Sequence, residues 1–434
     1  MFYIFLYVIS LLIIILVQRV GIGSLKTPIT FFSGLWCVIG ILANLGLYNI
    51  YRPSDMVNNI ILIGIWVFFI TFSIGINGKK KSFFFKKLTP LDRTINYPMV
   101  ILINVICIIF ELPFAIKGIT YLVNGQLAFL RASGSGLLIG NTTLLLINET
   151  FVKPIVTATT IFCIVNSFYL KGKKIGLLAI ITIIENLMFV LVTAGRAPLV
   201  NLIFYFILAL IFMSGNSIKE VIHNHKKKIA SIVLVFLLVV YFTLMRSGNI
   251  NIINEVMESL YAYFCCGPAY LSQLLSNYHE YGMGGKLLYG SVTFGFFFNW
   301  IILFLQRVLR FSDLKTTITI LGSVITSRQY LIGVNSLTNS MCTCFYAFIV
   351  DWGYAGIIIG PIVVALMSLY FVNRVRKKMN ICNLCMYIYW IYMLIRTTFR
   401  WDLVSLDIGV IYFTLYLYTK APITIGKKLK TRDY

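Results

Sequence analysis

Arginine and lysine separate by position along this chain, and the separation bears on the chemistry that the chain can do. Segments that the hydropathy pattern places on the inner side of a membrane carry 19 Lys and 5 Arg, whereas the outer segments carry 4 Lys and 9 Arg. The inner excess is the usual topology signal. Arginine presents a planar fork of donors that suits phosphate and carboxylate, whereas lysine is a hydrated point charge. The arginine-rich outer face therefore predicts a site for an anionic substrate.

The leading outer arginines stand at the ends of predicted helices. Arg196 occupies the tight turn Thr193–Pro198, where the N-terminus of the following helix favours an anion. Arg246 closes a predicted span at the same level. Weaker candidates for the same role are Arg131, Arg328 and Arg400.

These arginines also have simpler interpretations. The Arg196 side chain can reach the lipid headgroups while its stem stays in apolar surroundings. Arg396 and Arg400 lie close in sequence to Asp402, and an ion pair there would neutralise part of the positive charge.

Two residues are candidates for accepting a proton from a hydroxyl group. His279 is the histidine of the long outer segment, and imidazole titrates near neutral pH. Asp351 stands where a late span begins, beside Trp352. Its carboxylate could act as a base or accept a hydrogen bond from a sugar hydroxyl group. A lone surface histidine is often incidental, and Asp351 has the alternative of capping a helix or pairing with an outer arginine.

Metal and nucleotide motifs are missing from the sequence. HExxH, DxD and GxxxxGK[ST] do not occur, and Cys382 and Cys385 form a lone CxxC without a second pair. We therefore expect no metal and no cofactor. A site that handles pyrophosphate would depend on arginines and backbone amides.

Composition predicts an all-α polytopic membrane protein with a single membrane domain. The 434 residues have a mean hydropathy of +0.89, with 59% hydrophobic and 12% charged residues. Apolar runs of about 20 residues, separated by charged clusters, are typical of transmembrane helices. The net charge of +23 sits in short loops, so it favours contact with anionic lipid and no binding of nucleic acid.

Eleven spans are predicted, with the amino end outside and the carboxyl end inside. The basic clusters fall on alternate loops, which supports this count. The expected spans are 2–17, 28–50, 57–77, 99–120, 151–170, 175–194, 198–214, 229–245, 345–370, 381–397 and 401–419.

The spans divide the chain into three regions. Residues 1–245 hold the first eight spans and an outer loop at 121–150. Residues 246–344 form a large outer loop, and 345–434 hold the last three spans and a basic tail. The long loop is too apolar for disorder and predicts a cap of helices lying on the membrane. The alternative is two further spans within 289–334.

Three acidic residues fall within predicted spans, where ionisable groups usually mark a pathway, a site or an ion pair. They are Glu111, Glu185 and Asp407. Glu185 and Arg196 are eleven residues apart, close to three helical turns, so they share one helix face. Glu185 could orient Arg196 or could serve helix packing.

This layout resembles the O-antigen and capsular polysaccharide repeat-unit polymerases of bacteria, the Wzy family. The resemblance lies in some eleven spans with a large outer loop near the carboxyl end. It also lies in short motifs: Thr-Ala-Gly-Arg196-Ala-Pro, Arg246 at the end of a span, Gly267-Pro268 within Tyr263–Tyr270, and Asp351-Trp-Gly-Tyr-Ala-Gly. Trp352 stands where that family usually has Phe or Tyr.

The resemblance implies a metal-independent glycosyltransferase with the membrane-embedded type C architecture, acting at the outer face of the bacterial inner membrane. Its substrate would be an undecaprenyl-diphosphate-linked oligosaccharide, and its partners would include a chain-length regulator and a flippase. Arg196 and Arg246 would hold the diphosphate, His279 would be the general base, and Asp351 would orient the acceptor or act as the base.

Two other functions fit the same residues. A flippase or transporter of lipid-linked oligosaccharide would use the intramembrane acids as a pathway, although no internal repeat is visible. A ligase that transfers finished glycan to another acceptor shares the donor chemistry and is not separated from a polymerase by these residues.

Overall fold

The computed structural model describes residues 1–77, 95–126, 129–131, 134–169, 173–213, 230, 233–237, 252–276, 287–311, 314–325, 330–334, 337–338 and 342–419. The longer helices are α1 (Phe2–Val17), α3 (Asp55–Asn77), α4 (Tyr97–Val123), α8 (Lys153–Tyr169), α9 (Lys173–Thr193), α10 (Ala197–Met213), α13 (Ile252–Ser276) and α18 (Gly356–Lys377). The shorter helices are α2 (Leu35–Leu45), α6 (Gly136–Ile139), α7 (Thr142–Ile147), α15 (Gly295–Val308), α16 (Thr317–Ile325), α17 (Cys344–Trp352), α19 (Ile381–Arg396) and α20 (Asp407–Thr419).

Short turns and one hairpin complete the described elements. The π-helical turns are η1 (Gln18–Ile22), η2 (Thr30–Gly34) and η5 (Asn148–Val152), and the 3₁₀ turns are η3 (Leu47–Asn49), η6 (Gly353–Ala355) and η7 (Asp402–Val404). Strands β1 (Tyr330–Leu331) and β2 (Leu337–Thr338) pair antiparallel. The hairpin is a small addition to the predicted all-α fold.

The helices have the length and composition of an α-helical membrane protein. Within the described ranges, six helical stretches are long and apolar enough to cross a membrane. They are Phe2–Ile22, Asp55–Ile76, Tyr97–Val123, Thr142–Phe168, Gly176–Thr193 and Cys344–Lys377. Shorter apolar helices occupy Thr30–Leu45, Ala197–Phe212, Gly295–Val308 and Ile381–Arg396.

The predicted spans overlap the observed helices, with one exception. Most of the eighth span, 229–245, lies outside the described residues, and its described residues, 230 and 233–237, are helical. Several of the other helices are shorter than the roughly 20 residues that a bilayer requires. The membrane class is therefore confirmed, and the count of eleven spans stays a prediction.

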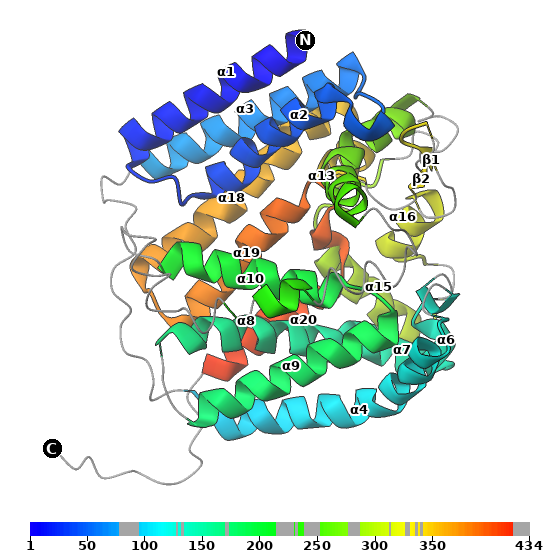
Figure 1. Cartoon of the computed structure of the whole chain (residues 1–434). Coiled ribbons are helices and arrows are strands. Elements are labelled where there is room, and N and C mark those ends of the chain that lie inside the picture. The colour runs from blue at the N-terminus through cyan, green and yellow to red at the C-terminus, as the bar shows by residue number, and fades with distance from the viewer. Residues whose placement is uncertain are drawn as a thin grey trace, which may run out of the picture.

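Helix α19 lies at the centre of the molecule, between α18 and the pair α8 and α10 (Figure 1). Its residues from Ile381 to Ile395 are all buried, because α8, α10 and α18 pack around it. Arg396 ends this helix. The hydroxyl groups of Thr397 and Thr398 donate to the Leu394 and Ile395 carbonyls, at 2.6 and 2.9 Å, and so satisfy part of the helix end.

Elements of the predicted cap gather at one end of the helix bundle, where α13, α15, α16 and the hairpin lie (Figure 1). Helix α15 has 14 residues and α16 has nine, so neither reaches the length of a span. This favours the cap over two further spans in 289–334. The cap is tied to the bundle: the Trp401 indole N–H donates to the Thr293 carbonyl at 3.1 Å, and the Tyr51 amide donates to the Ile332 carbonyl at 2.7 Å.

Helix α13 approaches the loop after α19 very closely. A Cβ atom at Gly267 would collide with the carbonyl oxygen of Thr398 and would lie 3.1 Å from the Thr343 methyl group. Only glycine allows this contact. The contact brings Tyr263 and Phe264, one turn earlier in α13, to the residues that follow Arg396.

Candidate functional site

Arg196 leads into α10 from the tight turn after α9. Its carbonyl accepts the Val200 amide at 3.1 Å, so it stands at the helix cap, and Ala194 before it has a positive φ of 45°. The guanidinium carbon lies 5.6 Å from the centre of the Tyr263 ring in α13. A cation over the face of an aromatic ring is attracted by the ring quadrupole, and this contact holds the Arg196 side chain against the cap.

Arg131 lies against the same turn. One of its terminal nitrogens would be 3.4 Å from a Cβ atom at Gly195. Because Gly195 has no side chain, the Arg131 guanidinium group can approach the backbone of this turn. The Arg131 side chain therefore reaches the turn that carries Arg196.

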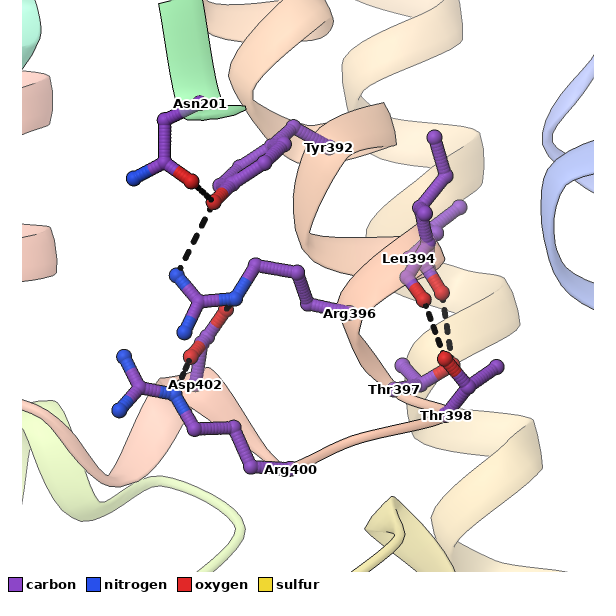
Figure 2. A network of polar contacts seen from close by, with 9 residues as sticks. Asn201, Tyr392, Leu394, Arg396, Thr397, Thr398, Arg400 and Asp402 are labelled. Carbon is purple, nitrogen blue, oxygen red and sulfur yellow. Dashed lines mark hydrogen bonds and ion pairs between the residues drawn. The ribbon is translucent and has the colours of Figure 1, made fainter. Parts of the chain in front are cut away.

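Arg396 and Arg400 share one carboxylate (Figure 2). Arg396 Nε lies 3.1 Å from Asp402 Oδ2, and Arg400 Nε lies 2.6 Å from Asp402 Oδ1. The Asp402 side chain is only 6% exposed, whereas that of Arg400 is 53% exposed. The predicted ion pair is thus present, and Arg400 still faces solvent beside it.

The Tyr392 hydroxyl joins this ion pair to α10. It accepts a hydrogen bond from Arg396 Nη1 at 3.2 Å and donates to the Asn201 side-chain oxygen (Figure 2). Asn201 is five residues after Arg196 in α10. The central helix α19 and the helix that begins at Arg196 are therefore held in register by polar side chains.

Aromatic rings lie between Arg196 and the segment that carries Arg396 and Arg400. The Phe399 ring lies 6.2 Å from the Tyr263 ring and 5.6 Å from the Phe264 ring. Phe399 lies between Arg396 and Arg400 in sequence, and the Tyr263 ring contacts the Arg196 guanidinium group. We name the resulting set Arg131, Arg196, Arg396, Arg400, Asp402, Tyr263 and Phe399 the arginine cluster.

The charges of the arginine cluster favour an anionic ligand. Four guanidinium groups and one carboxylate leave the named residues with a net positive charge. Guanidinium groups bind phosphate and carboxylate through paired, charge-assisted hydrogen bonds. Cys342 lies close enough for the Arg400 charge to act on it, but burial raises the pKa of this thiol to about 12. Cys342 therefore stays protonated near neutral pH and is not a nucleophile.

The structure brings together some of the predicted site residues and leaves others untested. Arg196, Arg131 and Arg400 belong to the arginine cluster. Predicted residues that lie outside the described part of the chain are Arg246, Arg328 and His279. In the described ranges, no group of three or more metal-binding side chains gathers.

Asp351 is a fully buried residue of α17 whose carboxylate holds the loop before α15. One oxygen accepts the Val292 amide at 3.0 Å, and the other accepts both the amide and the hydroxyl of Thr293 at 2.6 Å. Among the described residues no arginine pairs with it, and three donors occupy its two oxygens. The geometry favours positioning of the cap over the predicted role as a base.

Glu185 does not orient Arg196. Both of its carboxyl oxygens are buried without a hydrogen-bond partner, so the shared helix face predicted from the spacing produces no contact between them. Glu185 instead faces α4, which packs along α9.

The sequence analysis predicts Arg396 only as a partner of Asp402, and it does not identify Tyr263 or Phe399 as site residues. Arg396 had been assigned to an ion pair, and it is both paired and central to the cluster. The spacing Arg396-Thr-Thr-Phe-Arg400 was the available signal, because it places two arginines and an aromatic ring in one short turn. The place of Tyr263 beside Arg196 depends on the packing of α13.

Comparison of the chain with protein-family models, curated proteins and solved structures finds no match, so the functional assignment depends on these residues alone.

Proposed function

We propose that this protein is an oligosaccharide repeat-unit polymerase that acts on undecaprenyl-diphosphate-linked glycans at the outer face of a bacterial plasma membrane. The observation that carries the proposal is that three separate segments of a membrane protein contribute the four arginines of the arginine cluster: residues 129–131, the 193–198 turn, and the end of α19 with the loop after it. A lipid diphosphate combines an apolar tail with two adjacent phosphates, and so matches an arginine-rich site at the end of apolar helices.

The proposed reaction transfers a growing glycan from its lipid diphosphate to a hydroxyl group of a new lipid-linked unit. The bond between the anomeric carbon and the phosphate oxygen breaks as the bond to the acceptor oxygen forms. The acceptor hydroxyl loses its proton to a base, for which His279 remains the candidate. Undecaprenyl diphosphate leaves with the bonding electrons.

The arginines would act on the leaving group. Negative charge on the diphosphate grows as the bond to the anomeric carbon breaks, and donors that are already in position stabilise it without reorganisation. Asp402 and Tyr392 hold Arg396 in one orientation, which is the preorganisation that this effect requires. Arg400 and Arg196 lie nearer the exposed side and would reach the diphosphate directly.

The outer location rests on the distribution of basic residues. The arginine cluster belongs to segments on the lysine-poor side, while the lysine-rich loops alternate with them along the sequence. An active site at the outer face would meet lipid-linked units after they have crossed the membrane.

Deletion of the gene, followed by sizing of the surface glycan, tests the proposal. We expect the polymer ladder to collapse to a single repeat unit, with lipid-linked units accessible from outside. Accumulation of lipid-linked units on the inner face would instead identify a flippase. Full-length polymer that stays attached to its lipid carrier would identify a ligase. Restoration of the ladder by the wild-type gene, but not by an Arg196→Ala variant, would link the activity to the arginine cluster.

A further inference from the structure

Glu111 in α4 and Glu185 in α9 are buried acids to which the arginine cluster gives no role. Each is 2% exposed, and none of their four carboxyl oxygens has a hydrogen-bond partner. Asn148 in η5 is 1% exposed, and both polar atoms of its side chain are also unpaired. A buried polar group without a partner destabilises the folded state, because it has lost its hydrogen bonds to water. Three such side chains in one region indicate that something besides the protein satisfies them.

The two carboxyl groups lie at the same level of neighbouring helices. A Cβ atom at Gly118 in α4 would collide with the backbone of Leu191 in α9, so the helices touch there. Glu111 is seven residues before Gly118, and Glu185 is six residues before Leu191. Both carboxyl groups also act electrostatically on the Cys107 thiol, one turn below Glu111. These relations fit only parallel helices, in which Glu111 and Glu185 are about two turns from the shared contact.

Local backbone irregularities surround the same point. Asn148 begins a π-helical turn, a feature often found at functional sites. It lies next to Glu111, close enough to interact but without the geometry of a hydrogen bond. Pro113 lies inside α4 and has no amide N–H, so the Ile109 carbonyl lacks its helical donor. Ile109 and Pro113 are both exposed, so this carbonyl belongs to the outer face of α4. The buried oxygen atoms without donors between α4, η5 and α9 are those of Glu111, Asn148 and Glu185.

Positive charge for these acids does not come from a nearby lysine. Lys153 is the basic residue that acts on the Glu111 carboxyl group, and its ammonium group pairs with Glu149 at 2.8 Å. The Lys153 and Glu149 side chains are 44% and 41% exposed. Glu149 is adjacent to Asn148 in sequence. The exposed pair of Glu149 and Lys153 therefore lies where the surface is nearest in sequence to the buried side chains.

We propose that Glu111, Glu185 and Asn148 form an intramembrane binding site for a small monovalent cation, either a proton or a sodium ion. The available ligands are hard oxygen atoms: two carboxyl groups and one amide oxygen. Such ligands suit sodium, and acids inside a membrane also serve as proton carriers. One cation together with one proton neutralises both acids. The site is independent of the proposed glycosyl transfer.

Infrared difference spectroscopy of the full-length protein in lipid nanodiscs tests this site. The carbonyl band of protonated carboxyl groups is followed as the pH is raised in choline buffer, and again as sodium replaces choline at constant pH. We expect the folded wild-type protein to lose the band on addition of alkali, and to lose half of it on addition of sodium, because one proton stays with the bound sodium ion. Glu111→Gln and Glu185→Gln should each halve the change on addition of alkali. Glu149→Gln, an exposed acid in the same region, should leave it intact.

The two arms separate the ligands. Loss of the band on addition of sodium identifies a sodium site, and loss on addition of alkali alone identifies a proton site. A band that persists until the protein unfolds would show that the acids are permanently protonated structural groups, and would overturn the proposal. The same holds if the double variant Glu111→Gln/Glu185→Gln shows the wild-type change. Circular dichroism of each variant confirms that it is folded.

Discussion

The guanidinium group of Arg196 lies over the ring of Tyr263, 5.6 Å from its centre, although the two residues belong to different helices, α10 and α13. Tyr263 in turn contacts Phe399, which lies between Arg396 and Arg400 in sequence. This aromatic bridge unites arginines that are about 200 residues apart in the chain. Each of the following predictions tests one part of that arrangement.

Replacement of Arg196 by lysine distinguishes the contribution of its positive charge from that of the planar guanidinium group. Lys keeps the positive charge but loses the planar fork and much of its fit to the Tyr263 face. We expect polymer formation to fall by about tenfold or more, as for the loss of a hydrogen bond to a charged group. The measurement is the length and amount of surface glycan. Arg307→Lys, in the cap but outside the arginine cluster, is the matched control, and full activity of Arg196→Lys would refute the role of the fork.

Asp402 holds Arg396 and Arg400 in place from a buried position. Removal of one member of a buried ion pair usually costs about 3–5 kcal/mol, because the partner charge stays buried without compensation. The loss of stability is smaller here, since the Arg400 side chain is half-exposed and water can solvate its charge. We expect Asp402→Ala to lower the thermal unfolding temperature clearly. Glu149→Ala removes an exposed pair, worth about 0–1 kcal/mol, and an equal decrease in both variants would contradict the structural role of Asp402.

Asp351 and Thr293 distinguish a positioning residue from a base. Thr293→Val removes one hydroxyl donor to the Asp351 carboxylate and keeps its shape, so we expect a loss of about 1 kcal/mol in stability. Asp351→Asn removes the charge and replaces one of the two accepting oxygens by an N–H donor that faces another donor, so it should destabilise the protein more. The measurements are unfolding temperature and polymer formed per folded protein. Complete loss of activity in Asp351→Asn with an unchanged unfolding temperature would assign the base role to Asp351.

His279 remains the candidate base of the outer segment. A base in this position would take the proton of the acceptor hydroxyl group. We therefore expect His279→Ala to abolish polymer in membrane vesicles while single lipid-linked units stay accessible. Polymer formation close to wild type in His279→Ala would exclude this residue as the base.

Gly267 sets the distance between α13 and the loop that carries Arg400. A methyl group there would collide with the Thr398 carbonyl oxygen, and overpacking of this kind typically costs about 1–3 kcal/mol. We expect Gly267→Ala to weaken both stability and polymer formation, because it separates Tyr263 from Phe399. Gly176→Ala in α9 has no atom within 4 Å of the new methyl group. It should be neutral or slightly stabilising, and similar behaviour of the two variants would contradict the close approach.

Local patterns were sufficient to predict most of the helices. The stretch Tyr97–Val123 is continuous and apolar, and the observed helix agrees with the predicted span within a few residues. The 289–334 region was ambiguous because its apolar composition fits both a span and an interfacial helix. Its resolution into α15 and α16 depends on contacts such as that of Asn299 with the Val404 carbonyl, at 2.8 Å, which hydropathy does not encode.

The sequence by itself determined the membrane class and the separation of arginine from lysine, because both are properties of short consecutive segments. Tertiary structure decided which arginines meet. Arg396 joins Arg196 only because α19 is enclosed by other helices and Gly267 lets α13 approach the loop after it. It also showed that the Asp351 carboxylate is occupied and that the Glu185 carboxyl group makes no hydrogen bond to Arg196. Hydrogen bonds and contacts between distant segments depend on side-chain packing in three dimensions, which spacing along a single helix cannot supply.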